Sequence, residues 1–172
     1  MSRDEVFDIV DEQGRPVGKA LRSQVHGNPE LIHQAAHVIV EDSRGRIYLQ
    51  KRSPDKDIQP GKWDTSVGGH AAPGEAPEAT ARREMAEELG HAPENLKFLY
   101  RYLWRSPVET ELVSTFLCRD NGPFRPDPVE ISEGRFWGRE EIESALGSGM
   151  FTPNFEVEFR RFSSWLDERC SD

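Results

Sequence analysis

The chain has 172 residues, enough for one domain with a hydrophobic core and too few for two of ordinary size. Its 31 Asp and Glu residues outnumber its 22 Lys and Arg residues, which gives a formal net charge of -9. This balance argues against a general nucleic-acid binder, which carries a basic face, but it is compatible with a phosphorylated substrate if a metal ion supplies positive charge.

The first part of the chain predicts short strands separated by turns. Glu5–Val10 and residues 17–21 flank the turn residues DEQGRP and form an expected N-terminal hairpin, whereas Arg22–Leu31 is expected to be irregular. His37–Glu41 and Ile47–Arg52 flank the turn DSRGR, which predicts a second hairpin. A loop broken by prolines then leads to one short strand, WDTSVGG.

The second part predicts a mixture of helices and strands. The expected elements are a helix at Ala79–Leu89, strands at Leu96–Arg105, Glu111–Arg119 and Gly134–Gly138, and amphipathic helices at 139–146 and 154–170. Pro77 suits the first turn of the first helix, and Gly90 suits its C-terminal cap. Because strands and helices interleave without a regular βαβ order, we expect a mixed sheet flanked by helices.

The bulk features also predict a compartment and an organisation. The N-terminal segment MSRDEVFDIV lacks the apolar core of a signal peptide, and no apolar run is long enough to span a bilayer. With two distant cysteines, Cys118 and Cys170, we expect a cytoplasmic protein with reduced thiols and no membrane partner. We expect a single domain over residues 1–172, with its core at about 33–140, an N-terminal hairpin and a C-terminal helix; either of these two could support a homodimer.

Three glutamates of the first long helix lie unusually close together. Glu84, Glu87 and Glu88 are spaced i, i+3 and i+4, so their carboxylates share one helix face and repel one another. A bound divalent cation would remove this repulsion, and hard oxygen ligands suit Mg²⁺ or Mn²⁺. The opposite face carries Met85 and Leu89 for packing on a sheet. A merely solvated charged face is the alternative interpretation of the helix alone.

The segment around this helix resembles the Nudix signature, G-x5-E-x7-R-E-U-x-E-E-x-G-U, in which U is apolar. The matching residues are Gly69, Glu75, Arg83, Glu84, Met85, Glu87, Glu88 and Gly90. The one departure is His91, which stands in the last apolar position. Fixed letters at this many fixed spacings are a specific signal.

The resemblance implies an α/β/α sandwich with a mixed β-sheet and a metal-binding loop-helix-loop. It implies a hydrolase that cleaves a small-molecule diphosphate, either a nucleoside di- or triphosphate or a nucleoside diphosphate derivative, with water activated by Mg²⁺ or Mn²⁺. The implied metal ligands are Glu84, Glu87, Glu88 and the backbone carbonyl of Gly69, with Gly68 as the alternative for that carbonyl. The same glutamates are the implied catalytic residues, with Glu87 or Glu88 helping to activate water, while Glu75 would pair with Arg83 to hold the loop.

Basic residues just before the signature are candidates for contact with substrate phosphate. They are Lys51, Arg52, Lys56 and Lys62, and surface solvation is the alternative for each of them. Many Nudix hydrolases carry a supporting glutamate in a late loop, for which Glu130 and Glu133 are the candidates here.

Three of the five histidines belong to a second pattern with two glutamates. Its members are His26, His33, His70, Glu109 and Glu111. Their order resembles the metal site of type I isopentenyl diphosphate isomerase, a relative of the Nudix hydrolases by fold, and the resemblance covers roughly residues 5–140. It implies a second divalent ion, Zn²⁺, Mn²⁺ or Mg²⁺, at this cluster. A structural relic without metal is the alternative.

One position separates the chain from that isomerase. The isomerase uses a catalytic cysteine where this chain has Gly68, in the segment SVGGH, and glycine cannot transfer a proton. We therefore expect a hydrolase of the isomerase-like branch of Nudix proteins, which acts on a small diphosphate and not on nucleic acid. The alternatives are an isomerase-like enzyme acting on prenyl diphosphates and a diphosphate-sensing module without catalysis.

Overall fold

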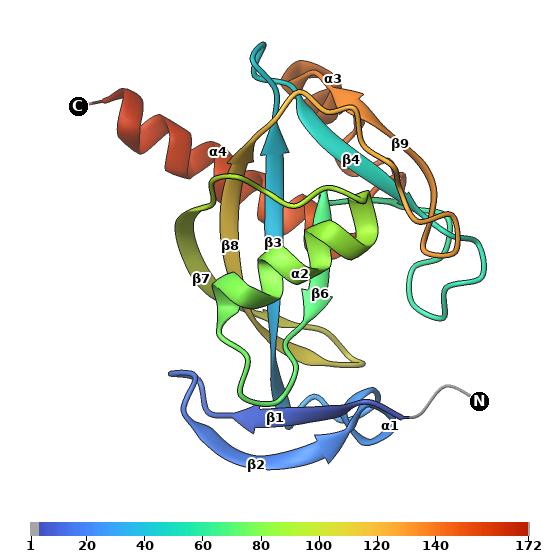
Figure 1. The fold of residues 1–172 in the computed structure, drawn as a ribbon, viewed down its shortest axis with the longest axis vertical. Helices are drawn as coiled ribbons and strands as arrows, with labels where there is room; N and C mark the ends of the chain where they lie inside the picture. The colour runs from blue at the N-terminus through green and yellow to red at the C-terminus, as the bar shows by residue number, and fades with distance from the viewer. Residues whose placement is uncertain (1–3, 172) are drawn as a thin grey trace.

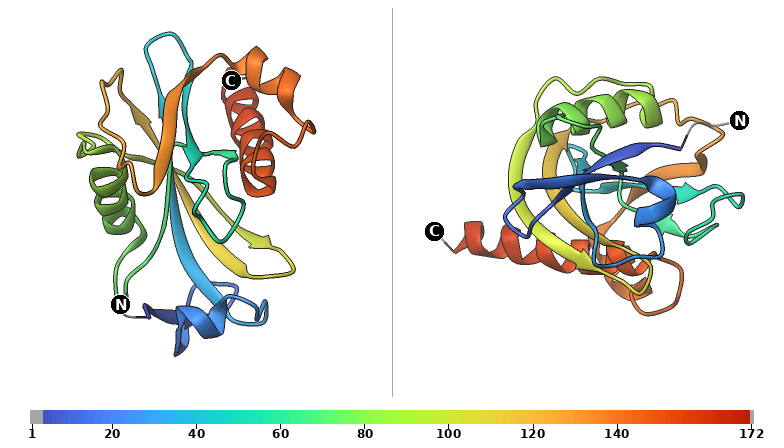
Figure 2. Two further views of the ribbon diagram at one scale, coloured as in Figure 1. Left: turned by 90° about the vertical axis from the view of Figure 1, so that its right-hand side faces the viewer. Right: turned by 90° about the horizontal axis from the view of Figure 1, so that it is seen from below.

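The computed structural model describes residues 4–171 and places a mixed sheet between two layers of helices (Figures 1 and 2). The strands are β1 (Val6–Val10), β2 (Pro16–Leu21), β3 (Ile32–Glu41), β4 (Ile47–Arg52), β5 (Trp63–Asp64), β6 (Val67–His70), β7 (Lys97–Arg105), β8 (Thr110–Arg119) and β9 (Ile131–Trp137). The helices are α1 (Arg22–Val25), α2 (Pro77–Leu89), α3 (Arg139–Ala145) and α4 (Pro153–Cys170). Helix α2 covers one face of the sheet and α4 the other, which confirms the expected α/β/α sandwich.

Strand β3 is the centre of the sheet. It pairs in parallel with β8 over its whole length, from Ile32 opposite Thr110 to Glu41 opposite Arg119. Its other edge pairs in antiparallel with β1 near the start and with β6 further along. Because side chains alternate along a strand, Val38 packs under α2 whereas Ile39 packs under α4.

Helix α2 has the core side that its sequence predicts. Ala81, Met85 and Leu89 are fully buried and pack against β3 and β8. Pro77 lies in the first turn, and Gly90 ends the helix with a left-handed φ of 64° that glycine adopts without strain. This packing turns the opposite, acidic side of the helix away from the core.

Helix α4 covers the second face of the sheet with aromatic side chains. Thr152 caps the helix by accepting a hydrogen bond from the Phe155 amide at 3.1 Å. Phe155, Phe159 and Phe162 are buried at the spacing that the sequence predicts. Glu158 is also fully buried on this apolar side, which is unusual for a carboxylate.

The hairpin expected between 37–41 and 47–52 is present only next to its turn, where the two strands pair in antiparallel. Within the described residues, β3 and β4 pair only through Glu41 and Ile47, whereas β4 pairs along its length with β9. Strand β3 also begins at Ile32, before the expected start at His37, and β9 begins at Ile131 rather than Gly134. Turn residues specify that the chain reverses, but tertiary packing selects the strand partners.

Two further elements differ from the expectation. Residues 22–31, expected to be irregular, contain α1, whose first turn is held when the Gln24 side chain accepts a hydrogen bond from the Leu21 amide at 2.8 Å. The expected strand WDTSVGG is broken at Thr65–Ser66 into β5 and β6. Neither feature has an apolar period long enough to be read locally.

The described chain contains no helix that is long and apolar enough to cross a membrane. Both Cys118, which is buried, and Cys170, which is exposed, are free thiols.

We predict that Gly134→Ala destabilises the protein. A methyl group at Gly134 would overlap the hydroxyl of Tyr48 and lie 2.7 Å from its Cζ. The Tyr48 ring is buried between Phe124 and Phe136, with ring centroids 4.9 and 5.3 Å away, so it cannot move aside freely. Overpacking of this kind costs about 1–3 kcal/mol, which a urea denaturation curve would measure.

Gly138→Ala is the matched control for this change. An added methyl group there meets no atom within 4 Å, and the φ of -66° is ordinary for alanine. Equal denaturation midpoints for the two variants would contradict the prediction.

Candidate functional site

A cavity of about 590 Å³ lies beside β6 and reaches both faces of the sheet. Its lining includes acidic residues of α2 on one side and Asn154 of α4 on the other. Members of both sequence patterns line it, namely Glu84, Glu87, Glu88, Gly69, His26, His70, Glu109 and Glu111. The volume is typical of a small-molecule site, and the two patterns therefore open into one space.

Glu84 lies directly against the backbone of β6. A side chain at Gly69 would overlap the Glu84 carboxyl group, so only glycine allows this close approach. Burial raises the pKa of Glu84 to about 7, although Arg83 Nη1 lies 2.8 Å from its Oε1. Without a cation, this carboxyl group is therefore partly protonated at neutral pH.

Glu88 is held by two hydrogen bonds. Its Oε2 accepts one from Gln50 Nε2 at 2.9 Å and a longer one from the Gly68 amide at 3.4 Å. Burial, reinforced by the charge of Glu84, raises the pKa of Glu88 to about 8. A divalent cation bound at this carboxyl group would displace the proton and stabilise the ionised form.

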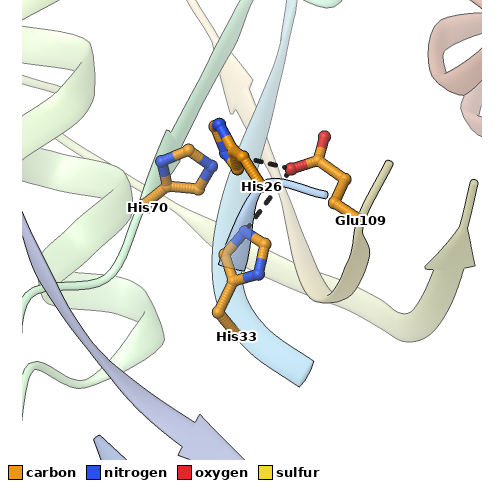
Figure 3. A group of neighbouring side chains, drawn as sticks. All are labelled: His26, His33, His70 and Glu109. Atoms are coloured by element: carbon orange, nitrogen blue, oxygen red, sulfur yellow. Dashed lines mark ion pairs between the residues drawn. The ribbon is translucent and has the colours of Figure 1, made fainter. Parts of the chain in front are cut away.

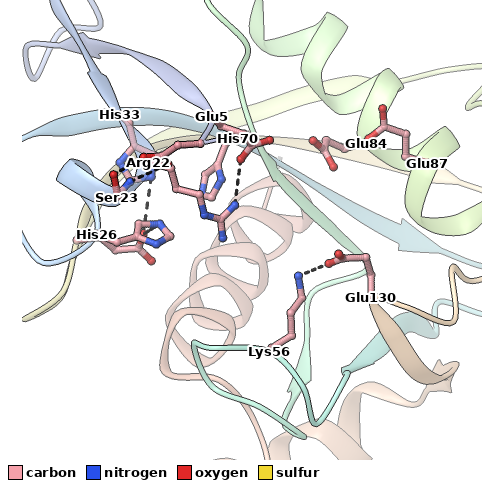
Figure 4. Close-up of polar contacts among 12 residues, drawn as sticks. Glu5, Arg22, Ser23, His26, His33, Lys56, His70, Glu84, Glu87 and Glu130 are labelled. Atoms are coloured by element: carbon pink, nitrogen blue, oxygen red, sulfur yellow. Dashed lines mark hydrogen bonds and ion pairs between the residues drawn. The ribbon is translucent and has the colours of Figure 1, made fainter. Parts of the chain in front are cut away.

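Glu87 is more open than its two neighbours. Its side chain is 60% exposed, and its Oε2 lies 3.3 Å from Arg83 Nη1. Figure 4 shows Glu84 and Glu87 projecting from α2 on the same side of the helix. Among residues 4–171, the glutamates of α2 do not form a group of ligand atoms within 4.8 Å of one another, so the three share a cavity wall but do not yet surround one point.

Arg83 ties the loop before α2 to the helix. Its Nε and Nη2 donate to the two carboxylate oxygens of Glu75 at 2.9 Å each, and Nη2 also donates to the His70 carbonyl at 3.0 Å. The Arg83 guanidinium is the largest cause that lowers the pKa of Glu75, to about 2. This bidentate pair holds the end of β6 and the start of α2 at a constant separation.

The histidine cluster lies at the other end of the cavity. Figure 3 shows His26, His33, His70 and Glu109 converging, and their ligand atoms lie within 4.8 Å of one another. The Oε2 atom of Glu109 is 3.3 Å from His26 Nε2 and 3.7 Å from His33 Nε2. Glu111 joins the group, with its Oε1 at 3.1 Å from His70 Nε2 and 3.4 Å from His33 Nε2.

The donor set of this cluster fits a divalent cation. His26 Nε2, His33 Nε2 and Glu109 Oε2 are buried without a hydrogen-bond partner among the described residues, although all three converge. Buried polar atoms are nearly always satisfied, and an ion between them would satisfy all three. Burial lowers the pKa of His26 and His70, which keeps both rings in the neutral form that ligates a metal.

The elements that carry the cluster are distant in the chain. His26 follows α1, His33 lies near the start of β3, and His70 ends β6. The His33 ring stacks on Phe7 of β1 at 5.1 Å between centroids, which sets its orientation. The short helix and the early start of β3, both missed in the sequence, are therefore the parts that place two of the histidines.

The candidate phosphate contacts divide into two groups. Arg52 and Lys56 line the cavity, and Arg52 Nη1 lies 3.3 Å from Asp64 Oδ2. Lys51 and Lys62 are not among the described residues that line it. Arg52 and Lys56 are thus the two of these four that line the cavity.

Of the two candidate supporting glutamates, Glu130 and Glu133, only the first lines the cavity. Glu130 lines the cavity and forms an ion pair with Lys56, as Figure 4 shows. Glu133 is exposed on β9 and is not a lining residue.

Other polar lining residues were missed in the sequence. They include Arg22, whose Nη1 lies 3.0 Å from Glu5 Oε2, and His37. The signal for His37 was a polar letter inside the apolar run of β3.

His91 occupies the position where the signature has an apolar residue. Its Nε2 lies 2.7 Å from Asp120 Oδ2, and its ring meets the Phe124 ring at 5.8 Å between centroids. The departure is therefore accommodated at the end of α2 and does not reach the cavity lining.

Relatives of the chain carry two different names. A family model of the NUDIX domain matches residues 31–155. A Yersinia pestis protein named an uncharacterized Nudix hydrolase is 34% identical over 162 residues, which cover 94% of this chain and 86% of that protein. The isopentenyl-diphosphate Delta-isomerase of Streptomyces avermitilis is 36% identical over 156 residues, 87% of this chain and 79% of that protein.

Solved structures share the fold. The crystal structure of DR0079 from Deinococcus radiodurans matches with a TM-score of 0.81 and 26% identity, over 91% of this chain and 98% of that one. A MutT protein from Methanosarcina mazei Go1 matches with a TM-score of 0.69 and 19% identity, over 83% and 96% of the two chains. With its signature, its sandwich fold and a matched domain that covers most of its length, the chain belongs to the Nudix family.

Proposed function

We propose that the protein hydrolyses the diphosphate linkage of a small molecule, with Mg²⁺ or Mn²⁺ held by Glu84, Glu87, Glu88 and the carbonyl of Gly69. The observation that supports this most is the pair Glu84 and Glu88, two partly buried carboxyl groups that line the same cavity and have raised pKa values. Like charges at this depth are stable when a divalent cation joins them. The sandwich fold and the family support the same assignment.

The residues around these carboxylates have distinct tasks. A bound divalent cation neutralises phosphate charge and lowers the pKa of a bound water. Gln50 and the Gly68 amide orient Glu88. Glu87 or Glu88 accepts the proton of the attacking water; of the two, Glu87 is the one more open to solvent.

Arg52 and Lys56 are proposed to bind the non-bridging oxygens of the substrate. Both line the cavity, and in the absence of substrate each pairs with a carboxylate, Asp64 and Glu130 respectively. Exchange of these partners for phosphate oxygens would preserve the ion pairing of both cations. Phosphate binding is therefore compatible with the acidic character of the cavity.

A prenyl diphosphate isomerase is the second candidate function. The geometry of the histidine cluster favours it, as does the name of the Streptomyces relative. Gly68 opposes it, because glycine has no group that transfers a proton, and a Cβ atom there would lie 3.2 Å from His37 Cδ2, which is a tight contact. In either function, we propose that the histidine cluster holds a Zn²⁺, Mn²⁺ or Mg²⁺ ion.

Glu88→Gln is predicted to abolish most of the turnover. The change keeps the shape of the side chain and removes the charge that binds the cation, so kcat/KM should fall about 100-fold or more. The assay would present nucleoside diphosphate compounds together with isopentenyl and dimethylallyl diphosphate, with Mg²⁺ or Mn²⁺, and would identify the products.

Glu78→Gln is its control, because Glu78 lies on the same helix, exposed and paired with Arg82. Interconversion of the two prenyl diphosphates without hydrolysis of any compound would refute the hydrolase proposal.

Binding of Mg²⁺ is predicted to release protons. The pKa values of Glu84 and Glu88 are raised to about 7 and about 8, so the metal-free protein retains protons there that a cation displaces. Affinity for Mg²⁺ should therefore rise as the pH increases from about 6 to about 9. The same shifts stabilise the metal-free fold below pH 4.5, the ordinary pKa of a glutamate, and this contribution is lost as the pH rises through about 7 and 8.

Titration calorimetry in buffers of different ionisation enthalpy would count the released protons. Proton release that is absent, or unchanged in Glu88→Gln, would show that these carboxyl groups do not bind the ion.

Glu109→Gln is predicted to weaken a second, tighter class of metal binding. Loss of one ligand from the histidine cluster should lower its affinity for Zn²⁺ or Mn²⁺ by about 10- to 100-fold. The exposed Glu94 provides the control Glu94→Gln. Calorimetric titration of metal-free protein would reveal the loss, and identical isotherms for the two variants would mean that the cluster is not a metal site.

A further inference from the structure

His37 is a buried histidine of the cavity that neither metal site uses. It lies on the α4 side of β3, is 7% exposed, and is one of the lining residues. In the sheet it stands opposite Gly68 of β6 and opposite Thr115 of β8. A polar ring so deep in an otherwise apolar strand requires a partner or a function.

The free edge of the His37 ring faces the place where Gly68 has no side chain. A Cβ atom at Gly68 would lie 3.2 Å from His37 Cδ2 and 3.3 Å from Nε2. The Gly68 amide contacts Glu88, and His70, two residues further on, belongs to the histidine cluster. Nε2 is therefore directed at the stretch of β6 that joins the two groups of metal ligands.

The Nδ1 edge of the His37 ring faces Glu158 of helix α4, on the side away from the cavity. His37 Nδ1 lies 3.6 Å from Oε1 of Glu158, which is fully buried on α4 and accepts a hydrogen bond from Thr115 Oγ1 at 2.8 Å. Burial opposes a charge on the ring, but Glu158 first, and then Glu111 and Asp64, raise the pKa of His37 to about 9. Nδ1 forms an ion pair with Glu158 that is longer than a hydrogen bond, and the Nε2–H group is left as a donor towards Gly68.

His37 differs from Arg52 and Lys56, the two proposed phosphate contacts, in the position of its partner. Arg52 and Lys56 pair with Asp64 and Glu130, which are themselves lining residues. Glu158 is not among the described lining residues and lies behind the ring. The Nε2 edge of His37 can therefore bind an anionic ligand while the ion pair between Nδ1 and Glu158 stays intact.

We propose that His37 contacts the substrate, with Nε2–H donating a hydrogen bond to an anionic phosphate oxygen held between the two groups of metal ligands, and that Glu158 is its positioning residue. The identity of the ligand rests on the proposed function, because only a diphosphate substrate brings such an oxygen to this place. The glycine at position 68 is then part of the substrate site, since any larger side chain would close the gap in front of the ring.

The test is calorimetric binding of inorganic pyrophosphate and of methylenediphosphonate in the presence of Mg²⁺. His37→Asn keeps a donor near the position of Nδ1 for Glu158 but removes Nε2, and we expect its affinity to fall about 10- to 100-fold. His91→Asn, outside the cavity lining, is the control and should bind like the wild type. Equal affinities of His37→Asn and the wild type would overturn the inference.

A second measurement does not depend on the folding of that variant. Imidazole nitrogen resonances of the wild-type protein should show a shift at His37 Nε2 when pyrophosphate is added. Glu158→Gln should lower the titration midpoint of His37 from about 9 towards the ordinary value, an effect that loss of packing alone would not produce. The inference would also be overturned if the His37 Nε2 chemical shift did not change on addition of pyrophosphate. It would be overturned equally if the His37 titration midpoint were the same in Glu158→Gln and in the wild type.

These outcomes separate the two proposals. Failure of the wild type to bind either diphosphate would refute the proposed function, and this inference with it. Wild-type binding and hydrolysis together with unaltered His37→Asn affinity would refute the role of His37 alone.

Discussion

The parallel ladder between β3 and β8 is the constraint on which both candidate sites depend. It places His33 directly opposite Glu111, so two members of the histidine cluster are strand partners. The antiparallel pairing with β6 on the other edge places His37 opposite Gly68. Because side chains alternate along a strand, a slip of one residue would turn both histidines to the α2 face and separate them from their partners. The burial of β3 on both faces fixes this register.

The sequence predicted what is encoded locally. Helix α2, its Gly90 cap and its acidic face lie within one short segment, and the aromatic stripe of α4 is readable at helical spacing. The strand partners of β3 and β4 could not be read, because non-local packing selects them. Lys51 and Arg52 are neighbours on one strand and point to opposite sides, so only the arrangement of the sheet shows which of them faces the cavity. The pair His37 and Glu158 was hidden for the same reason, since 121 positions separate its members.

The acidic composition and the candidate site have one physical explanation. An anionic substrate would be repelled from a cavity lined by so many carboxylates unless cations were present in it. The structure has a group of converging side chains that could hold a metal ion, at the histidine cluster, and a few basic side chains held by ion pairs. Relatives with hydrolase and isomerase names align over most of this chain at similar identity, so overall similarity does not choose between the two chemistries. The resemblance to the isomerase implies a difference at position 68, where the His37 ring lies close to the glycine of this chain.

The close contact between position 68 and the His37 ring has an evolutionary consequence. If hydrolases and isomerases of this branch share an ancestor, a cysteine gained at position 68 in a chain like this one would be pressed against a buried imidazole. The ring would have to shift by a few tenths of an ångström to admit the thiol, and a smaller residue 37 would relieve this contact but leave Glu158 without its counter-charge in the core. The three positions are therefore coupled by contact, so a substitution at one of them changes the surroundings of the other two. Residues 37, 68 and 158 are expected to vary together among relatives as one epistatic unit.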